Sequence, residues 1–420
     1  MSIRVAVIGA GVSGLACAAR LAATGVSVRI FDKSHAPSGR CATRQWRWSP
    51  AVNDRGATAS PANPPAQVSP ARDVDAEEVI PVDHGAPFFT CPSPCFRAAI
   101  DRLAATGAAD VRSLPSAAVV DADGTVVPPP PGGRRYVAGG NRRLGEALAA
   151  AAVAAGDVTT MYGTRIEDEA VMTDVDDCAG VVGGVGSGLP DGPYTAVVVT
   201  PPGPQAAALL GLPPSAGVPY ATTLTVVLAV AGAPPADAER VFLRRTPAHP
   251  LLTFSTCEAV KGAIESPATA GGGATTVYVG HAGGLPGAAP VAAAWADSHF
   301  DSPTDAWAPA LVAAVADVWG LGSAPRVAAT FSHRWRYARA VTVAEAGAGL
   351  TGKGEGPFRV AGRWGVYVCG DGVGTGGATN GEQDVWAAAE AAIDSAYMSG
   401  VGCADAVLED AAGLRGWGGR

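Results

Sequence analysis

A glycine-rich turn near the start of the chain constrains the fold more than any other feature of the sequence. Residues 3–8 (IRVAVI) form an apolar run typical of a buried parallel strand. A GxGxxG motif follows at residues 9–14 and leads into residues 12–24, which predict a helix. Residues 26–31 (VSVRIF) then predict a second strand. Strand, turn, helix and strand follow in register, so we expect a Rossmann βαβ unit that binds a dinucleotide.

Each glycine of the motif has its own expected role. Gly9 makes the tight turn, Gly11 lets the backbone approach a pyrophosphate, and Gly14 lets the helix pack closely on the strand. Val12 and Ser13 open the helix, where free N–H groups and the helix dipole favour a phosphate. We therefore expect all five residues to bind the dinucleotide.

An acidic residue ends the second strand. Asp32 stands where a carboxylate accepts hydrogen bonds from a ribose diol and repels a 2′-phosphate. Lys33 follows it, and we place both residues in the dinucleotide site. An NAD-like or FAD-like ribose is favoured over its 2′-phosphorylated form.

A second turn follows at residues 38–41 (SGRC) and has two interpretations. It is either a polar surface turn or a second contact to the cofactor phosphates. In the second case Gly39 permits close approach, Arg40 donates charge-assisted hydrogen bonds and Cys41 lies beside them. The position after Asp32 favours the second interpretation.

A further ligand contact is expected late in the chain. Residues 365–369 (GVYVC) predict a buried strand, and Gly370 and Asp371 follow it directly. A turn before the helix predicted over residues 384–398 would present backbone N–H groups to a polar ligand. That turn contains Thr379, Asn380 and Gly381. The alternative is an ordinary connection in which Asn380 caps the helix.

Composition excludes several classes of protein. The net charge of −8 and the lack of a dense Lys/Arg tract argue against a general nucleic-acid binder. We expect no membrane span and no signal peptide, because no apolar run is long enough and a strand pattern starts at Ile3. The eight cysteines lack zinc-like spacing, so we expect free thiols, no metal and a reducing compartment such as the cytoplasm or an organelle stroma or matrix.

Several long stretches, taken together, resemble one family. They are GAGVSGLACAARL, FDKSHAPSGRCATR, VDHGAPFFT, RYVAGGNRRLGEALA, AVVVTPPGPQAAALL, HRWRYAR and GVYVCGDGVGTGGATNGE. They resemble the glutathione-reductase-type FAD superfamily and, more narrowly, renalase and the related flavin amine oxidases. The resemblance covers most of the chain except residues 49–81 and the C-terminal tail.

The sequence departs from the renalase pattern at three places. Renalase-like chains usually have Gly-Gly-Arg at residues 38–40, where this chain has Ser-Gly-Arg, and Leu-Gly-Ala-Gln-Tyr at residues 84–88, where it has His-Gly-Ala-Pro-Phe. Asn380-Gly381 replaces the usual Glu-Gly pair. The last two changes lie where the family lines its flavin, so they bear on the substrate.

The resemblance implies noncovalent FAD, with His84, Gly85, Ala86 and Ile166 added to the cofactor-binding residues. It implies that the flavin takes a hydride on N5 from a reduced nicotinamide dinucleotide and passes electrons to O2, giving hydrogen peroxide. Two alternatives stay open: oxidation of an amine or desaturation of an apolar substrate, and a non-catalytic, partner-binding protein of the same fold. The intact glycine motif and Asp32 argue against the last.

Few residues are candidates for the substrate pocket. His84 touches either the flavin edge or the substrate, or is a hydrogen-bonded structural group. Trp335, Arg336 and Tyr337 mix aromatic faces with a cation, which suits a nicotinamide or adenine ring and its phosphate. Their alternative is a plain strand with an outward arginine.

The order of motifs predicts an α/β chain of two parts. A Rossmann-type FAD-binding domain is expected from residues 1–90, 136–215 and 360–402, with residues 49–81 as a loop insertion. A substrate domain on a mixed or antiparallel sheet is expected from residues 91–135 and 216–359. Residues after 400 carry little pattern, and we expect them to be loosely ordered.

Overall fold

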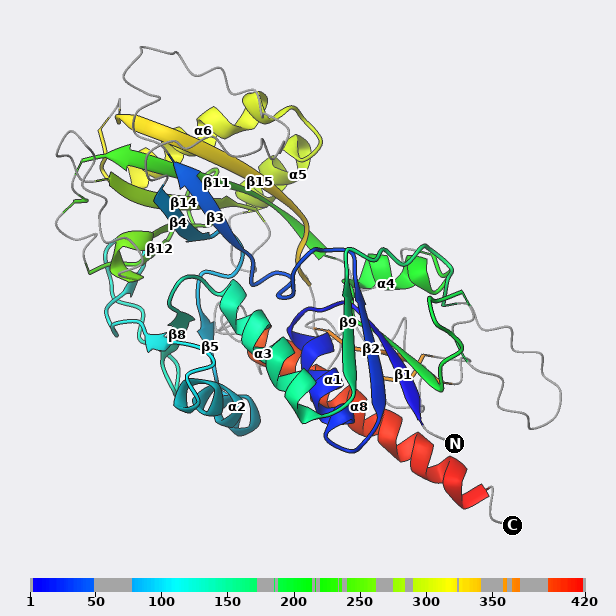
Figure 1. The fold of residues 1–420 in the computed structure, drawn as a ribbon. Coiled ribbons are helices and arrows are strands. Elements are labelled where there is room, and N and C mark those ends of the chain that lie inside the picture. Colours follow the sequence, from blue (N-terminus) through cyan, green and yellow to red (C-terminus); the bar gives the residue numbers. More distant parts are fainter. Residues whose placement is uncertain are drawn as a thin grey trace, which may run out of the picture.

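Two separate β-sheets organise the chain, one parallel and one largely antiparallel (Figure 1). The computed structural model describes residues 3–48, 78–171, 185, 188–213, 216, 220–232, 234–235, 240–261, 275–283, 290–322, 325–340, 358–360, 365–370 and 392–417. The predicted fold class, a Rossmann-type sheet beside a second mixed sheet, is confirmed.

The parallel sheet has the strand order β16-β10-β1-β2-β9, and every neighbouring pair is parallel. Its strands are β1 (Arg4–Ile8), β2 (Ser27–Asp32), β9 (Val158–Tyr162), β10 (Ala196–Val199) and β16 (Val366–Val368). Chain order reverses at β1, with β2 on one side and β10 on the other. In open α/β sheets, ligands bind outside the carboxyl ends of the strands at such a switch point.

Three helices lie together against this sheet: α1 (Val12–Ala22), α3 (Arg142–Ala155) and α8 (Ala392–Trp417) (Figure 1). Small residues let them approach closely. A Cβ on Gly400 would stand 2.1 Å from the carbonyl oxygen of Ser13, so only glycine allows α8 to cross α1 at that point.

Helix α8 corrects the expectation for the end of the chain. We expected a helix over residues 384–398 and loose order after residue 400, but the helix continues to Trp417. Its second half is anchored: Arg359 donates two hydrogen bonds to Asp410 at 2.8 and 2.9 Å, and the Tyr367 hydroxyl donates to the same carboxylate. Scattered alanines and glycines hid the helical period, and its start before residue 392 lies outside the described residues.

The second sheet has the order β15-β11-β14-β13-β12-β7. Its strands are β7 (Val119–Val120), β11 (Tyr220–Ala231), β12 (Leu243–Arg245), β13 (Phe254–Cys257), β14 (Thr275–Ala282) and β15 (Val327–Ala340). All neighbours are antiparallel except β12 and β7, which are parallel.

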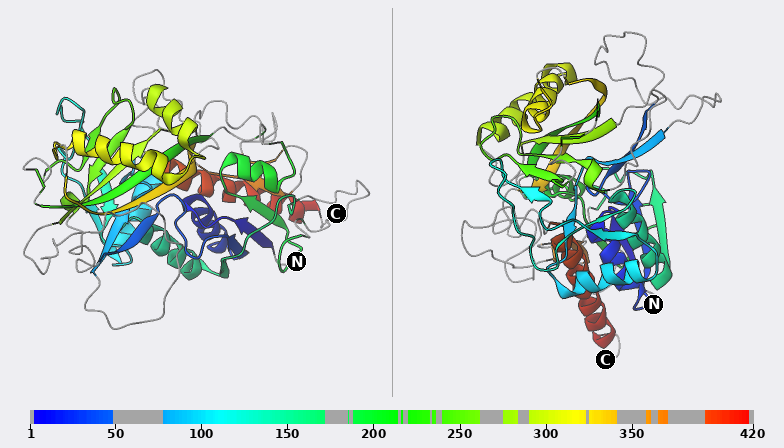
Figure 2. Two further views of the ribbon diagram at one scale, coloured as in Figure 1. Left: turned by 90° about the horizontal axis from the view of Figure 1, so that it is seen from above. Right: turned by 90° about the vertical axis from the view of Figure 1, so that its left-hand side faces the viewer.

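Different elements cover the two faces of this sheet (Figure 2, right). Helices α5 (Pro290–His299) and α6 (Thr304–Val318) cover one face, where Trp307 and Tyr278 are buried. A two-stranded ribbon of β3 (Thr43–Trp48) and β4 (Glu78–Asp83) covers the other, packing Ile80 and Val82 against Val277. This ribbon was not predicted; its second strand begins inside the expected 49–81 insertion, and residues 49–77 lie outside the described part of the chain.

A small antiparallel sheet of β5 (Phe89–Thr90), β8 (Arg134–Val137) and β6 (Val111–Ser113) carries helix α2 (Pro94–Ala105), and a short helix α4 (Gly203–Leu209) follows β10. The described strands of the parallel sheet all fall in the ranges predicted for the FAD-binding domain. The β3–β4 ribbon falls there too, yet it packs on the other sheet. The division into two domains stays a prediction.

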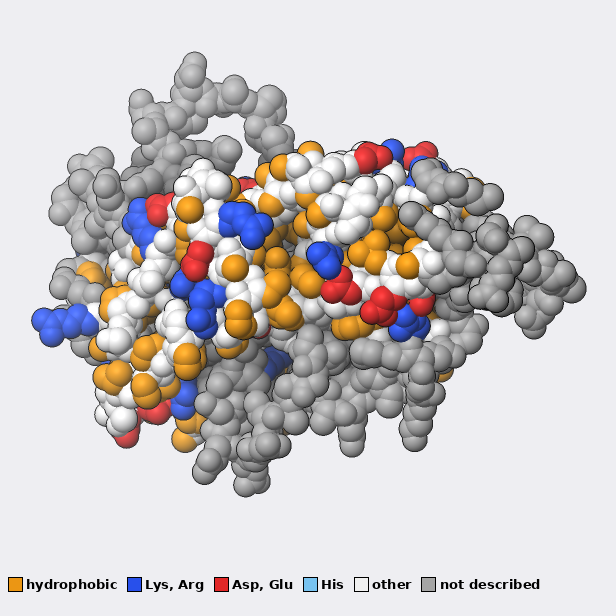
Figure 3. Space-filling model, turned by 90° about the horizontal axis from the view of Figure 1, so that it is seen from below, with side chains coloured by type: hydrophobic (Ala, Val, Ile, Leu, Met, Phe, Trp, Pro, Cys, Tyr) orange, Lys and Arg blue, Asp and Glu red, His pale blue; other side chains and the backbone are white. Residues whose placement is uncertain are grey.

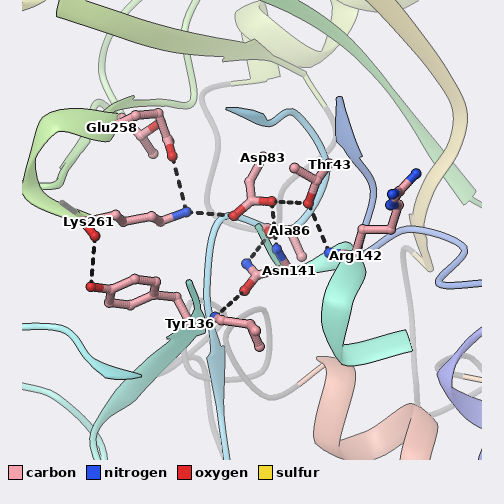
Figure 4. A network of polar contacts seen from close by, with 10 residues as sticks. Thr43, Asp83, Ala86, Tyr136, Asn141, Arg142, Glu258 and Lys261 are labelled. Atoms are coloured by element: carbon pink, nitrogen blue, oxygen red, sulfur yellow. Dashed lines mark hydrogen bonds and ion pairs between the residues drawn. The ribbon is translucent and has the colours of Figure 1, made fainter. Parts of the chain in front are cut away.

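A buried polar network joins the two halves of the chain (Figure 4). At its centre Asp83, at the end of β4, accepts a hydrogen bond from Lys261 Nζ at 2.8 Å, from the Asn141 N–H at 2.9 Å and from the Thr43 hydroxyl. Lys261 ends the short 3-10 helix η3 (Glu258–Lys261) after β13, and its Nζ also lies 3.2 Å from Glu258 Oε2. The side chains of Asp83, Lys261 and Glu258 are at most 3% exposed.

The charges of this network depend on one another. Burial opposes the charge of Lys261, but Asp83 and Glu258 outweigh it and raise the pKa of the ammonium. Burial raises the pKa of Glu258, and Lys261 only partly offsets that effect. The lysine is thus the single cation between two buried carboxyl groups.

We predict that Lys261→Met strongly destabilises the fold. The methionine keeps the length of the side chain but leaves Asp83 and Glu258 without their cation, and breaking a buried pair in this way costs about 3–5 kcal/mol. The free energy of unfolding in guanidinium chloride measures the loss. Arg20→Met is the control, because the Arg20–Asp405 pair is half exposed and should contribute about 1 kcal/mol or less. Equal losses in the two variants would contradict the prediction.

Candidate functional site

A cavity of about 860 Å³ lies between the two sheets. One wall is the carboxyl edge of the parallel sheet, with Ile8, Phe31 and Thr200, and the other wall is β11, β13, β14 and β15 of the second sheet. Ligand pockets typically measure about 300–1,000 Å³, so a large dinucleotide cofactor fits this volume.

The glycine turn has the geometry that the sequence predicts. Gly9 has a φ of +107°, which favours glycine, and its N–H donates to the Phe31 carbonyl at 2.7 Å. A Cβ on Gly14 would stand 2.0 Å from the Gly9 carbonyl oxygen, so the helix could not pack as it does. A Cβ on Gly11 would meet no atom within 4 Å, because Gly11 borders the cavity.

The N-terminus of α1 has the features of an anion-binding site. Gly11 is its N-cap residue, no side chain caps the helix, and its first turn has no acidic residue. Val12 and Ser13 line the cavity with it. An uncapped N-terminus with free N–H groups attracts phosphate through the helix dipole.

Asp32 fixes the turn as well as facing the cavity. Its Oδ2 accepts a hydrogen bond from the Ala10 N–H at 2.6 Å, and its Oδ1 accepts one from the Ser34 N–H at 2.7 Å. Lys33 lines the cavity next to it. A carboxylate can accept about four hydrogen bonds, so the two oxygens of Asp32 can accept further ones from ribose hydroxyls.

The second turn touches the first. A Cβ on Gly39 would lie 3.3 Å from Gly11 Cα, and Gly39, Arg40 and Cys41 all line the cavity. Ser38 has a φ of +123°, a conformation that favours the glycine found there in renalase-like chains; its hydroxyl donates to the Cys41 carbonyl at 2.8 Å. Burial raises the pKa of Cys41 to about 12, so its thiol is protonated.

Arg40 reaches from this turn to the second sheet. Its Nη1 donates to the Ala338 carbonyl at 3.3 Å, and its guanidinium lies 5.4 Å from the centre of the Tyr220 ring. The cation thereby stands at the rim where the two walls of the cavity meet.

The segment after Asp83 supplies a third part of the wall. Gly85 and Ala86 line the cavity, and a Cβ on Gly85 would stand 2.2 Å from the Arg40 carbonyl oxygen. The buried network holds this segment, because Asn141 Nδ2 donates to the Ala86 carbonyl at 2.9 Å (Figure 4). Asp83 and Lys261 thus act on the cavity through the backbone of residues 84–88.

His84 packs against side chains of β15 instead of lining the cavity. Its ring packs beside His333 and Trp335, with ring centres 4.9 and 5.3 Å away, and its carbonyl accepts a hydrogen bond from Trp335 Nε1 at 3.0 Å. Burial, with His333 adding to it, lowers the pKa of His84 to about 3, so the imidazole is neutral. His84 is not among the described residues that line the cavity.

The three candidates on β15 point in different directions. Trp335 lines the cavity, and Tyr337 does so beside Tyr220, with the two rings edge to face at 6.2 Å. Arg336 is also among the lining residues, but its guanidinium contacts Asp301 at 3.0 Å and lies over the Phe300 ring. An outward arginine was one of the two interpretations of this stretch.

Of the remaining predicted residues, the structure describes Ile166 and Gly370 but not the other four. Ile166 lines the cavity near Asp32. Gly370 lies at the end of β16, where its N–H donates to the Ser399 hydroxyl at 3.0 Å. Asp371, Thr379, Asn380 and Gly381 lie outside the described residues.

Two rows of side chains that cross the second sheet were not predicted. Trp335 pairs with Thr223 on β11. Two residues earlier on β15, His333 pairs with Thr225, and Thr225 in turn pairs with His281 on β14. His281 then pairs with Phe254 on β13. Thr223, His281 and Phe254 line the cavity. The alternation of TTVYVGHA places His281 on the face of Val277 and Val279, but the pairing partners are distant in sequence.

No group of His, Cys, Asp and Glu among the described residues could hold a metal ion, and no helix in the described part is long and apolar enough to cross a membrane. On the face in Figure 3, basic and acidic side chains are interspersed without a field of one sign among the coloured residues.

Comparisons with known proteins agree with this fold. The model of the NAD(P)-binding Rossmann-like domain family matches residues 7–103. Reduced UDP-galactopyranose mutase superposes with a TM-score of 0.58, at 12% identity over 97% of this chain and 96% of that chain. Putrescine oxidase bound to putrescine gives 0.52, at 12% identity over 97% and 99%, and a Pyrococcus furiosus protein gives 0.53, at 11% over 97% and 98%. At such identities the likeness shows the fold alone.

One short stretch has a closer relative. The zeta-carotene-forming phytoene desaturase of Myxococcus xanthus is 58% identical over 38 residues. The match spans 9% of this chain and only 7% of that protein. Residues 7–103 therefore resemble a Rossmann-like domain, and the chain shares its fold with the mutase and the putrescine oxidase.

We predict opposite effects for two substitutions in the glycine turn. Gly11→Asp should leave the fold as stable as before, because the new side chain meets open space and aspartate is a favourable N-cap residue. It should abolish dinucleotide binding, because its carboxylate stands where the phosphates would lie. Gly14→Ala should instead destabilise the fold by about 1–3 kcal/mol through overpacking against the Gly9 carbonyl.

The nucleotide content of each purified variant and its thermal unfolding distinguish the two effects. A Gly11→Asp variant that retains its dinucleotide would contradict the site. A Gly14→Ala variant as stable as the parent would contradict the packing argument.

Proposed function

We propose that this protein is an FAD-dependent oxidoreductase that takes a hydride from a reduced nicotinamide dinucleotide. The observation that carries the proposal is that one continuous cavity extends from the phosphate-binding turn and Asp32 to an aromatic wall on the second sheet. Bound FAD would supply the hydride acceptor in this cavity and return to its oxidised form with O2, giving hydrogen peroxide.

The described residues fit FAD. The uncapped N-terminus of α1 and the open space at Gly11 suit the pyrophosphate, and Asp32 suits the adenosine ribose. The segment containing Gly85 and Ala86 would lie beside the ring system, as in the family that the sequence resembles. Noncovalent binding is the proposal, supported by Cys41, the cysteine among the described lining residues, whose thiol stays protonated because burial raises its pKa to about 12.

The charges of the cavity favour a dinucleotide donor over an amine. The acidic residues among its described lining are Asp32 and Asp168, and neither belongs to the second sheet. Arg40 and Arg339 line the cavity beside that sheet. A protonated amine would find no carboxylate there, whereas the phosphates of a dinucleotide would find guanidinium groups, those of Arg40 and Arg339 among them.

The chemistry asks little of acid–base groups. The lone pair of the dihydropyridine nitrogen expels the hydride, so the protein has to bind the ring, orient it and exclude water. Trp335 is the candidate for orienting the donor, since its ring lines the cavity and its Nε1 is tied to the His84 carbonyl. His84 and Tyr337 would support that position without touching the reacting atoms.

A second candidate function is desaturation of an apolar substrate. The stretch shared with a phytoene desaturase favours it, as do the apolar residues Phe88, Leu243 and Phe254 in the cavity. This substrate would leave Arg40 and Arg339 without a role in binding, so we rank it second. A purely partner-binding role is disfavoured by the intact turn at residues 9–14.

We predict a yellow protein whose flavin is bleached fastest by reduced nicotinamide dinucleotides. Anaerobic stopped-flow mixing should compare the dihydronicotinamide dinucleotide isomers reduced at ring positions 2 and 6 with ordinary NADH, with putrescine and with an apolar polyene. All three dihydronicotinamide dinucleotides should reduce the flavin faster than putrescine or the polyene, because they carry phosphates for the arginines and the other two donors do not. Fastest bleaching by putrescine would overturn the choice of donor, and a colourless protein that cannot be reconstituted with FAD would overturn the whole proposal.

A further inference from the structure

His281 and Arg334 line the cavity, and each has a buried side-chain nitrogen without a hydrogen-bond partner among the described residues; the one on an aromatic part of the wall is Nε2 of His281. His281, near the end of β14, lines the cavity and is 4% exposed. Its Nε2 makes no hydrogen bond with any described residue. Buried polar atoms in folded proteins nearly always have a partner, so an unpaired one on a cavity wall marks a position where a ligand supplies it.

The ring of His281 is held in place by its neighbours. Its Nδ1 lies 3.1 Å from the Thr225 hydroxyl, and its face stacks on Phe254 with ring centres 4.3 Å apart and planes inclined by 21°. Thr225 and Phe254 are the residues opposite His281 on the adjacent strands, so both contacts follow from the register of the sheet. The edge of the imidazole ring that carries Nε2 is therefore the part of His281 that a ligand can contact.

His281 is neutral at physiological pH. Burial lowers its pKa to about 3, and the neighbouring His84 and His333 lower it as well. Those two imidazoles are themselves kept neutral, because burial lowers the pKa of His333 to about 4 and that of His84 to about 3. A neutral nitrogen on an aromatic wall matches a neutral, planar polar group rather than an ion.

A primary carboxamide has the chemistry that fits. The hydroxyl of Thr225 can donate to Nδ1 or accept from it, so Nε2 is either a donor or an acceptor. A carboxamide offers one oxygen and one NH2 group, and it can pair with either tautomer. The nicotinamide ring carries such a group, and Trp335 and Phe254 provide flat apolar surfaces beside it.

We propose that Nε2 of His281 binds the carboxamide of the nicotinamide ring, which makes His281 a residue that determines substrate specificity. This inference rests on the proposed function and names the group by which the donor is recognised. Thr225 is a positioning residue that holds the imidazole from behind.

The test compares two dinucleotides on the flavin-loaded protein. One is NAD+, and the other is the same dinucleotide with hydrogen in place of the carboxamide; perturbation of the flavin spectrum reports binding of each. The wild-type protein should bind NAD+ about tenfold more tightly, the value expected for one buried hydrogen bond and its loss. In His281→Phe, which keeps the stacked ring but removes both nitrogens, the two affinities should agree within about twofold.

Further variants separate recognition from general damage. His281→Gln keeps an amide and should restore part of the preference, and Thr225→Val should weaken it without changing thermal stability greatly. His299→Phe is the control, because this imidazole stacks on Trp295 in α5 and does not line the cavity. The control should keep the full tenfold ratio.

The outcomes distinguish this inference from the proposed function. If NAD+ binds but His281→Phe keeps the wild-type preference, or the wild type shows none, His281 does not recognise the carboxamide and the proposed function still stands. If neither dinucleotide perturbs the flavin spectrum of the wild type, the nicotinamide donor and the role of His281 fall together.

Discussion

The ion pair between Asp83 and Lys261 is the interaction on which the geometry of the cavity depends. Asp83 ends a ribbon that packs on the second sheet, and through Asn141 and Thr43 it also holds the start of α3 beside the parallel sheet. The backbone that follows Asp83 forms the cavity wall at Gly85 and Ala86. A buried charge pair is costly to desolvate and adds little net stability. Its value here is geometric: the pair joins η3, which follows β13 of the second sheet, to the β3–β4 ribbon and, through Asn141, to the start of α3 beside the parallel sheet.

The nucleotide end of the site could be predicted from the sequence because its constraints are local. Gly9 and Gly14 come within contact of each other across five residues, and Asp32 reaches back to Ala10 from the next strand. Steric requirements of that kind can be recognised in the sequence, because only glycine satisfies them. The same kind of constraint acts at the second turn, where Gly39 lies against Gly11. Ser38, at a φ that favours glycine, shows that the chain tolerates some strain there when a side-chain hydrogen bond to Cys41 compensates.

The substrate end could not be predicted in the same way, because strand register brings its residues together. His281, Thr225 and His333 are neighbours only through the pairing of β14, β11 and β15, and no spacing in the chain reveals that pairing. The β3–β4 ribbon escaped notice for a similar reason: its two strands are separated by a stretch with no apolar period. Helix α8 was predicted too short because alanine and glycine carry little amphipathic signal, although those small residues are what let it lie on α1. The pairing of Lys261 with Asp83 was not predicted either, because the two residues are distant in the chain.

The two ends of the cavity differ in their electrostatics, and this difference bears on the choice of substrate. The end at the parallel sheet has an uncapped helix N-terminus, the carboxylate of Asp32 and the ammonium of Lys33, all suited to a charged cofactor. At the second sheet the imidazoles are neutral because burial lowers the pKa of each one, with neighbouring imidazoles adding to this at His84 and His281 and Arg44 adding to it at His333. The described lining there contains no carboxylate. A hydride donor at that end has to be a neutral ring, with any charge placed at the rim near Arg40. A dihydronicotinamide meets both requirements, since its ring is uncharged and its phosphates lie at a distance from it. A protonated diamine meets neither, even though the fold is one that a putrescine oxidase also uses.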